Sequence, residues 1–231
     1  MIDPFGRTNG YTASFSHFMK THQELKSLIE KQIKFLEEAG AEIQVWTIAE
    51  PASEAEIADV ERELGFAIPP KLRQVYGSLA ASIEFDWVHL DEDLEDHDDY
   101  VAKGAVNWGL SRLKTDSDGA KGWGSHDPDS DWGKIWNATL PVVAVGNGDY
   151  IGVSLRGEET VVYLNHEAPD GHGSVISSDF PTFLTEWGNL MFPGPDYGYF
   201  ECFLSGPDHW IASDTKRARE WPLWLSGELE D

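Results

Sequence analysis

One segment, residues 53–79, constrains the fold most because it specifies two short helices and the turn between them. It opens with a capping box, in which the Ser53 hydroxyl and the Glu56 carboxylate satisfy backbone N–H groups at the start of a helix. Gly65 suits the left-handed conformation that ends a helix, and Pro70 suits the first turn of the next one. Apolar residues recur at helical spacing in both segments: Ile57, Val60, Leu64, Leu72, Val75, Tyr76 and Leu79. Such a chain must bury two amphipathic helices against another layer.

Alternating and apolar runs predict that this other layer is a sheet. Residues 82–87 alternate apolar and polar side chains, as a half-buried strand does. Three apolar runs, at residues 141–145, 150–155 and 160–165, are separated by Gly- and Asn-containing or Gly- and Glu-containing turns, so they predict a three-strand antiparallel meander. Residues 43–48 alternate weakly, and are either a short strand or a linker.

Two more helices flank these strands. The first has its apolar stripe at Phe18, Leu25, Ile29, Ile33 and Leu36, and we expect it to end at Gly40. The second follows a cap at Ser177, Ser178 or Asp179 and carries Phe180, Phe183, Leu184 and Trp187 on one face, with Gly188 at its end. This order of elements predicts an α+β fold in which helices pack on one antiparallel β-sheet.

The chain of 231 residues is long enough to bury one substantial core, for which 10 Trp, 11 Phe and 7 Tyr supply apolar material. We divide it into a helical N-terminal extension (1–48), a central domain (49–190) and a Trp-rich C-terminal extension (191–231) that packs on the same domain. Periodicity is lost between residues 89 and 136, which predicts a long acidic insertion with a single helical turn.

Charge restricts the class of partner. Asp and Glu number 41 against 17 Lys and Arg, so the net charge is -24, which disfavours nucleic acid and anionic membranes. The same field attracts a cationic protein partner, although charge can also serve solubility alone. Nine acids and no Lys or Arg occur in residues 84–99: Glu84, Asp86, Asp91, Glu92, Asp93, Glu95, Asp96, Asp98 and Asp99. They form either a solvated face or an electrostatic patch for a basic protein surface.

Cys202 is the only cysteine, so no disulfide can form within the chain, which favours a reducing compartment. We expect Cys202 to be a small buried hydrophobe. The sequence opens with no signal-peptide pattern and contains no apolar run of membrane-spanning length, so we expect a cytoplasmic protein that does not contact membranes.

Catalytic, cofactor and metal motifs fail on spacing. The glycines at 146 and 148 precede a strand, and neither a phosphate-binding loop nor a nucleophile elbow is present. His166, Glu167 and His172 lie in a Pro- and Gly-containing stretch, whereas a zincin needs two histidines one helical turn apart. Asp127, Asp129 and Asp131 alternate like Ca²⁺ ligands, but Trp132 stands where the loop needs glycine. We expect no enzyme, cofactor or metal, with weak Ca²⁺ binding or a solvated acidic loop as the alternatives for the aspartates.

Three motifs in order resemble the SUKH superfamily, which includes the fungal Smi/Knr cell-wall regulators and many bacterial immunity proteins. The first is Val60-Glu61-x-x-Leu64-Gly65-Phe66-x-Ile68-Pro69. The second joins Leu140-Pro141-Val142 to Gly148-Asp149-Tyr150-Ile151-Gly152. The third joins Val161-Val162-Tyr163 to His166-Glu167 and then to Ser178-Asp179-Phe180. The long insertion departs from the family pattern, as does Ser154, where the family's hairpin ends in an acid.

The resemblance implies a non-enzymatic protein-binding module. Its first form is an intracellular immunity protein that neutralises a toxin domain by direct binding; the alternative is a regulatory or scaffold protein with a normal cellular partner. For a basic toxin domain, charge and aromatic anchors would form the contact surface. The candidate contact residues are Asp91, Glu92, Asp93, Glu95, Asp96, Asp98, Asp99, Trp87, Trp108, Trp123 and Trp132.

Overall fold

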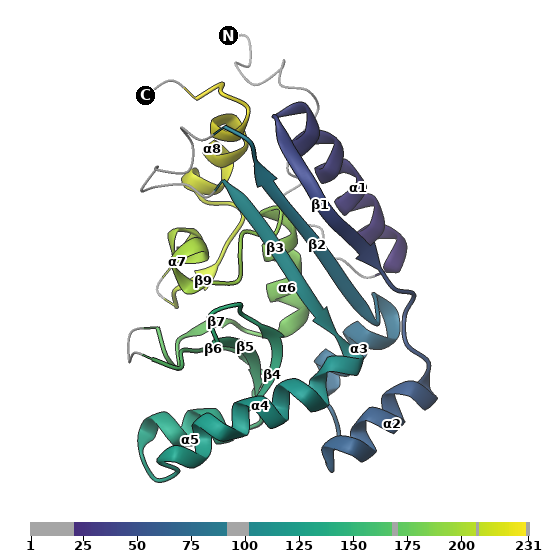
Figure 1. The fold of residues 1–231 in the computed structure, drawn as a ribbon, viewed down its shortest axis with the longest axis vertical. Helices are drawn as coiled ribbons and strands as arrows, with labels where there is room; N and C mark the ends of the chain where they lie inside the picture. The colour runs from purple at the N-terminus through teal and green to yellow at the C-terminus, as the bar shows by residue number, and fades with distance from the viewer. Residues whose placement is uncertain (1–20, 92–101, 168–170, 207, 230–231) are drawn as a thin grey trace.

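A seven-stranded antiparallel sheet with its strands in chain order forms the centre of the molecule (Figure 1). The computed structural model describes residues 21–91, 102–167, 171–206 and 208–229. The strands are β1 (Ala41–Ile48), β2 (Ser82–His89), β3 (Lys103–Gly109), β4 (Thr139–Ala144), β5 (Tyr150–Ser154), β6 (Val161–Leu164) and β7 (Val175–Ser177). A separate two-stranded ribbon pairs β8 (Leu204–Ser205) with β9 (Trp210–Ile211). The predicted α+β class is confirmed.

Helices occupy the space around this sheet, and α1 runs along β1 (Figure 1). They are α1 (His22–Glu38), α2 (Glu54–Leu64), α3 (Pro70–Ser78), α4 (Leu113–His126), α5 (Asp131–Asn137), α6 (Phe180–Asn189), α7 (Tyr197–Phe200) and α8 (Lys216–Leu225). None of the helices in the described residues has both the length and the apolar character needed to span a bilayer.

The local signals in the sequence act as predicted. Ser53 and Glu56 form the capping box of α2, and Gly65 ends that helix with a φ of 84°. Pro70 occupies the first turn of α3, and Asp179 is the cap of α6, accepting a hydrogen bond from the backbone N–H of Thr182. Residues 43–48 are part of a strand, β1, which pairs with β2 at the edge of the sheet.

The structure differs from the irregular insertion expected for residues 89–136. β3 pairs with β2 along its whole length, and α4 and α5 form a helical hairpin that continues to β4. The sequence pattern was obscured by glycine, which disfavours both helices and strands: α4 alone contains Gly119, Gly122 and Gly124. The segment therefore supplies a strand of the sheet and a helical layer beside it.

The sheet consists of two halves, β1–β3 and β4–β7, which meet at one pair, Trp108 with Val143. Beyond that pair β3 turns to the chain after α6 instead: the N–H of Ala105 donates to the carbonyl of Phe192 at 2.9 Å. Gly104 permits this approach, because a Cβ there would lie 2.5 Å from the Phe192 oxygen. Where the ladder to β4 is missing, β3 thus pairs with the chain at Phe192 and Pro193.

The larger of two core clusters runs from Leu25 in α1 to Leu225 in α8, and a smaller one joins Ala120 and Trp136 of the α4–α5 hairpin to Val162 and Leu164 of β6. Trp221 in α8 is fully buried, with its ring 6.1 Å from that of Trp87 and 5.0 Å from that of Phe203. The Trp-rich C-terminal segment therefore packs on the same core as the sheet.

Candidate protein-binding site

The predicted acidic patch falls largely outside the described residues. Glu92, Asp93, Glu95, Asp96, Asp98 and Asp99 all lie in residues 92–101, so their part in a contact surface stays a prediction. Asp91, the first of the run, follows the end of β2, and its N–H donates to Nδ1 of His89 at 3.1 Å.

Two of the four candidate tryptophans are core residues, and their assignment as contacts is wrong. Trp87 and Trp108 expose 1% and 0% of their surface. Trp87 donates to the carbonyl of Met191 at 2.8 Å, and Trp108 packs edge-on against Tyr76 at 5.2 Å. Both sit at the inward positions of their strands, where alternation turns every second side chain towards the covering helices.

The other two, Trp123 and Trp132, come together in a surface cleft of about 880 Å³. We call this the tryptophan cleft, and its lining residues are Gly119, Gly122, Trp123, His126, Asp127, Ser130, Trp132, His166 and Glu167. It lies between the α4–α5 hairpin and the loop that follows β6. A volume of this size accommodates a large side chain or a short peptide segment of a partner.

The α4–α5 hairpin sets the positions of both rings. Trp123 lies in the last turn of α4, and Trp132 lies in the first turn of α5, whose cap is Ser130. The turn between the helices folds back onto α5 at Gly133, where any Cβ would collide with the carbonyl oxygen of Asp127. Asn137 links the end of α5 to the last turn of α4, since its side-chain amide donates a hydrogen bond to the carbonyl of Gly124 at 3.0 Å.

Trp136 forms the buried support for these rings. Its centroid lies 6.5 Å from that of Trp123 and 5.7 Å from that of Trp132. His172 stacks on Trp132 at 5.4 Å with an interplanar angle of 29°. Burial lowers the pKa of His172 below its ordinary value, although the contact of Nε2 with the Trp132 carbonyl opposes this, so its neutral form is favoured.

The tryptophan cleft is lined by two carboxylates, those of Asp127 and Glu167, and by two histidines, His126 and His166. Asp127 and Glu167 are both exposed, and neither Lys nor Arg is among the described residues of the lining. Glu167 Oε1 lies 3.2 Å from Nε2 of His166. The cleft therefore combines aromatic surface with negative charge.

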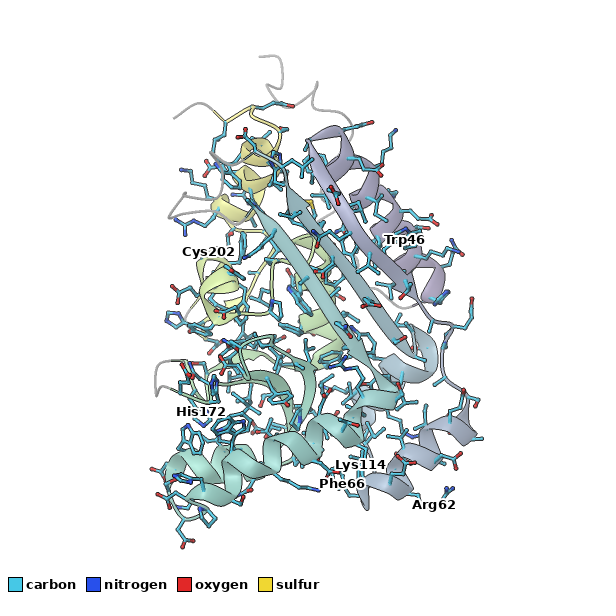
Figure 2. All side chains as sticks on the ribbon, in the orientation of Figure 1. Trp46, Arg62, Phe66, Lys114, His172 and Cys202 are labelled. Atoms are coloured by element: carbon cyan, nitrogen blue, oxygen red, sulfur yellow. The ribbon has the colours of Figure 1, made fainter. Side chains whose placement is uncertain are left out.

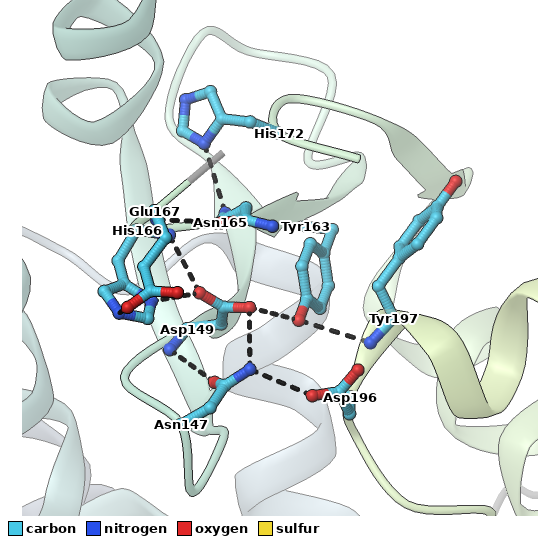
Figure 3. Close-up of polar contacts among 9 residues, drawn as sticks. All are labelled: Asn147, Asp149, Tyr163, Asn165, His166, Glu167, His172, Asp196 and Tyr197. Atoms are coloured by element: carbon cyan, nitrogen blue, oxygen red, sulfur yellow. Dashed lines mark hydrogen bonds and ion pairs between the residues drawn. The ribbon is translucent and has the colours of Figure 1, made fainter. Parts of the chain in front are cut away.

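A buried polar network holds His166 in place (Figure 3). Asp149 accepts hydrogen bonds from the Tyr163 hydroxyl at 2.6 Å and from the backbone N–H of His166 at 2.8 Å. His166 Nδ1 lies 2.6 Å from the same carboxylate, and Asn147 Nδ2 donates to it at 3.1 Å. Burial alone would raise the pKa of Asp149, but these hydrogen bonds outweigh it and the pKa is lowered. The ionised carboxylate fixes Nδ1 of His166 as a donor.

This network positions side chains rather than presenting a reactive group. Asp149 and Tyr163 are buried, and the His166 ring packs against Trp123 at a centroid distance of 5.0 Å. Cys202, the only thiol, packs at the edge of the core, and burial raises its pKa to about 11. Sequence reasoning had placed Asp149 and His166 in motifs without a role; the Gly-Asp turn and the His-Glu pair were the available signal.

A second, smaller groove of about 350 Å³ lies at the seam of the sheet. Asp86, Lys103, Asn147, Asp196 and Tyr199 are among its lining residues. Lys103 Nζ lies 4.8 Å above the Tyr199 ring, and Asn147 donates to Asp196 at 2.9 Å as well as to Asp149. Asn147 thus joins this groove to the network that holds His166.

The metal-like patterns of the sequence do not assemble in the part of the chain that the structure describes, where no group of three or more His, Cys, Asp or Glu side chains could hold an ion. His166 Nδ1 faces Asp149, and His172 Nδ1 accepts a hydrogen bond from the N–H of Asn165 at 3.2 Å. The alternating aspartates 127, 129 and 131 are exposed around the α4–α5 turn.

Residues 51–186 match the family model described as SMI1 / KNR4 family (SUKH-1), which is more than half of the chain. The match includes the α4–α5 hairpin and the Asp149 network, while α1, β1 and α8 lie outside it. A search of the curated proteins finds no significant match. The family resemblance indicated by the three sequence motifs is confirmed.

Proposed function

Because the chain belongs to the SMI1/KNR4 family (SUKH-1), we propose that it is a non-enzymatic binding protein of the immunity type, which neutralises a toxin domain by direct binding in the cytoplasm. The observation that carries the proposal is the tryptophan cleft, where the exposed Trp123, the partly buried Trp132 and two carboxylates meet on a chain of net charge -24. Aromatic anchors with a charged rim are typical of protein-binding surfaces.

The mechanism follows from charge and shape. The negative field attracts a basic domain and speeds its encounter, and the rim carboxylates exclude acidic competitors. Once the complex has formed, this chain covers the substrate-binding site of the toxin domain, which can then no longer reach its substrate. This function needs no chemical step, which agrees with a buried Asp149–His166 pair that holds a wall of the cleft.

Capture from the native host tests the proposal. The chain is used as bait and the bound material is washed at about 50 mM and about 500 mM salt, since screening weakens exposed charge pairs. We expect one basic domain that is released at high salt and whose toxicity the purified chain abolishes in co-expression. A toxin gene beside the gene for this chain would add independent support.

The opposite outcome is equally specific. If the bait retains housekeeping or cell-envelope proteins, and no captured protein is toxic on its own, the immunity proposal fails and the regulatory or scaffold role takes its place.

A further inference from the structure

We propose that the tryptophan cleft receives an arginine side chain of the bound protein, with the guanidinium stacked on the Trp123 ring and paired with Asp127 and Glu167. The inference rests on the proposed function, because it names the chemistry by which the partner is held. It commits the cleft to one kind of occupant.

Trp123 presents an exposed ring to the cleft. Trp123 shows 37% of its surface and Trp46 40%, but Trp46 stands on the edge strand β1, whereas Trp123 lines a cleft. Figure 2 shows Trp46 on the opposite side of the molecule from His172, which stacks on the other cleft tryptophan, Trp132. Trp123 is thus an exposed ring set in a concave surface, where a cation can lie over the face of the indole.

Charge decides the sign of the occupant. The lining carries Asp127 and Glu167 but neither Lys nor Arg among its described residues, and burial favours the neutral form of the neighbouring His172. The cleft therefore repels an acidic or phosphorylated segment. It attracts a cationic group both through a cation–π contact with the ring faces and through ion pairs with the carboxylates.

Shape favours arginine over lysine. The guanidinium is planar and weakly hydrated, so it can stack on an indole while its edge donates to a carboxylate. The lysine ammonium is compact and strongly hydrated, and cannot make both contacts in the same plane.

The walls of the cleft are fixed before binding. Trp136 supports both tryptophans, Gly133 lets the turn after α4 pack closely on α5, and Asp149 holds His166 against Trp123. A preformed site does not have to order its side chains on binding, so more of the contact energy appears as affinity.

The test uses the full chain labelled with ¹⁵N and the peptide acetyl-Gly-Arg-Gly-amide, against the same peptide with neutral citrulline and with lysine. Indole N–H signals are assigned with the variants Trp123→Phe and Trp132→Phe. We expect the arginine peptide to shift the Trp123 and Trp132 signals in a saturable way, and the citrulline peptide to leave them unchanged. Lysine should bind more weakly than arginine.

Three variants place the contact. Trp123→Ala should weaken binding of the arginine peptide roughly tenfold. Asp127→Asn, an exposed change that leaves the rings in place, should weaken it less, and the matched control Trp46→Ala should leave it unchanged. Unshifted amide signals elsewhere in the spectrum show that each variant is folded.

The inference is overturned if the arginine peptide shifts neither indole signal, or if citrulline shifts them equally. Because the peptide replaces the partner, the result is independent of the capture experiment. If the arginine peptide binds but no toxin is captured, the proposed function fails and this inference stands. If a toxin is captured but the peptide shifts neither indole signal, this inference fails and the proposed function stands.

Discussion

Asp149 shows how one residue can organise a site without facing the partner. Its buried carboxylate accepts hydrogen bonds from Tyr163, His166 and Asn147 (Figure 3). His166 lines the tryptophan cleft, and Asn147 lines the groove at the seam. Hydrogen bonds to a buried charge are among the strongest that a protein makes. Loss of this charge should therefore be felt in stability and in the position of the His166 ring.

Asp149→Asn should lower the free energy of unfolding at pH 7 by about 3 kcal/mol, since the amide cannot accept all of these hydrogen bonds. The folded-state pKa of Asp149 is lowered, so its contribution is present above the ordinary value near 3.8 and is lost as the pH falls through the folded value. Urea unfolding from pH 7 to pH 2 measures this. The difference between wild type and variant should be constant above about pH 5 and shrink below about pH 4.

A constant difference down to pH 2 would mean that Asp149 acts through shape alone and not through its charge. Asp127→Asn, on the exposed rim of the cleft, is the control, and should change stability by less than about 0.5 kcal/mol at any of these pH values.

Sequence reasoning at the residue scale succeeded where the pattern is local and failed where burial depends on the other strands. Ser53, Gly65 and Pro70 act on their own backbone, so their roles could be predicted. The tryptophans were all assigned to one surface, although Trp87 and Trp108 point into the core. The position of Trp87 in an alternating strand contained this information, since its neighbours Glu84 and Asp86 occupy the other face.

At the scale of elements, α4 is a helix that the sequence pattern did not predict. It contains three glycines and lacks a side-chain cap at its N-terminus, so neither composition nor boundary signals mark it. Its stability comes from packing against α5 and β4 instead. The helix carries Trp123, which means that the binding site rests on an intrinsically weak element.

Gly122→Ala should therefore stabilise the protein by about 0.5–1 kcal/mol, because alanine has the higher helix propensity and restricts the unfolded chain. A Cβ at Gly122 meets no atom within 4 Å, so nothing in the fold opposes the change. The gain in stability is measured as a rise in the melting temperature relative to the wild type. Gly124→Ala is the matched contrast: its Cβ would lie 2.4 Å from Oδ1 of Asn137 and 3.1 Å from the Cβ of Trp136, so it should destabilise the protein. A loss of stability in Gly122→Ala would show that this glycine has a role beyond the helix backbone.

For the whole molecule, the common core implies that the chain unfolds as one unit. Trp221, in the C-terminal segment, contacts Trp87 of the sheet and Phe203. Trp221→Ala should cost about 3–5 kcal/mol and lower the melting temperature of the entire protein, including the sheet. Calorimetry and near-ultraviolet circular dichroism should give one coincident transition. Two separate transitions would show that residues 191–231 are an independent unit.

The seam between β3 and β4 has a consequence for how such a protein acquires a new specificity. The chain between these strands holds α4 and α5, and the strands share one backbone pair, Trp108 with Val143. Lengthening or replacing residues 119–137 would leave both ladders, β1–β3 and β4–β7, with their own hydrogen bonds intact. A change of partner can then begin with divergence in one contiguous stretch of the gene, while His166 and Glu167 keep the other wall of the cleft in place.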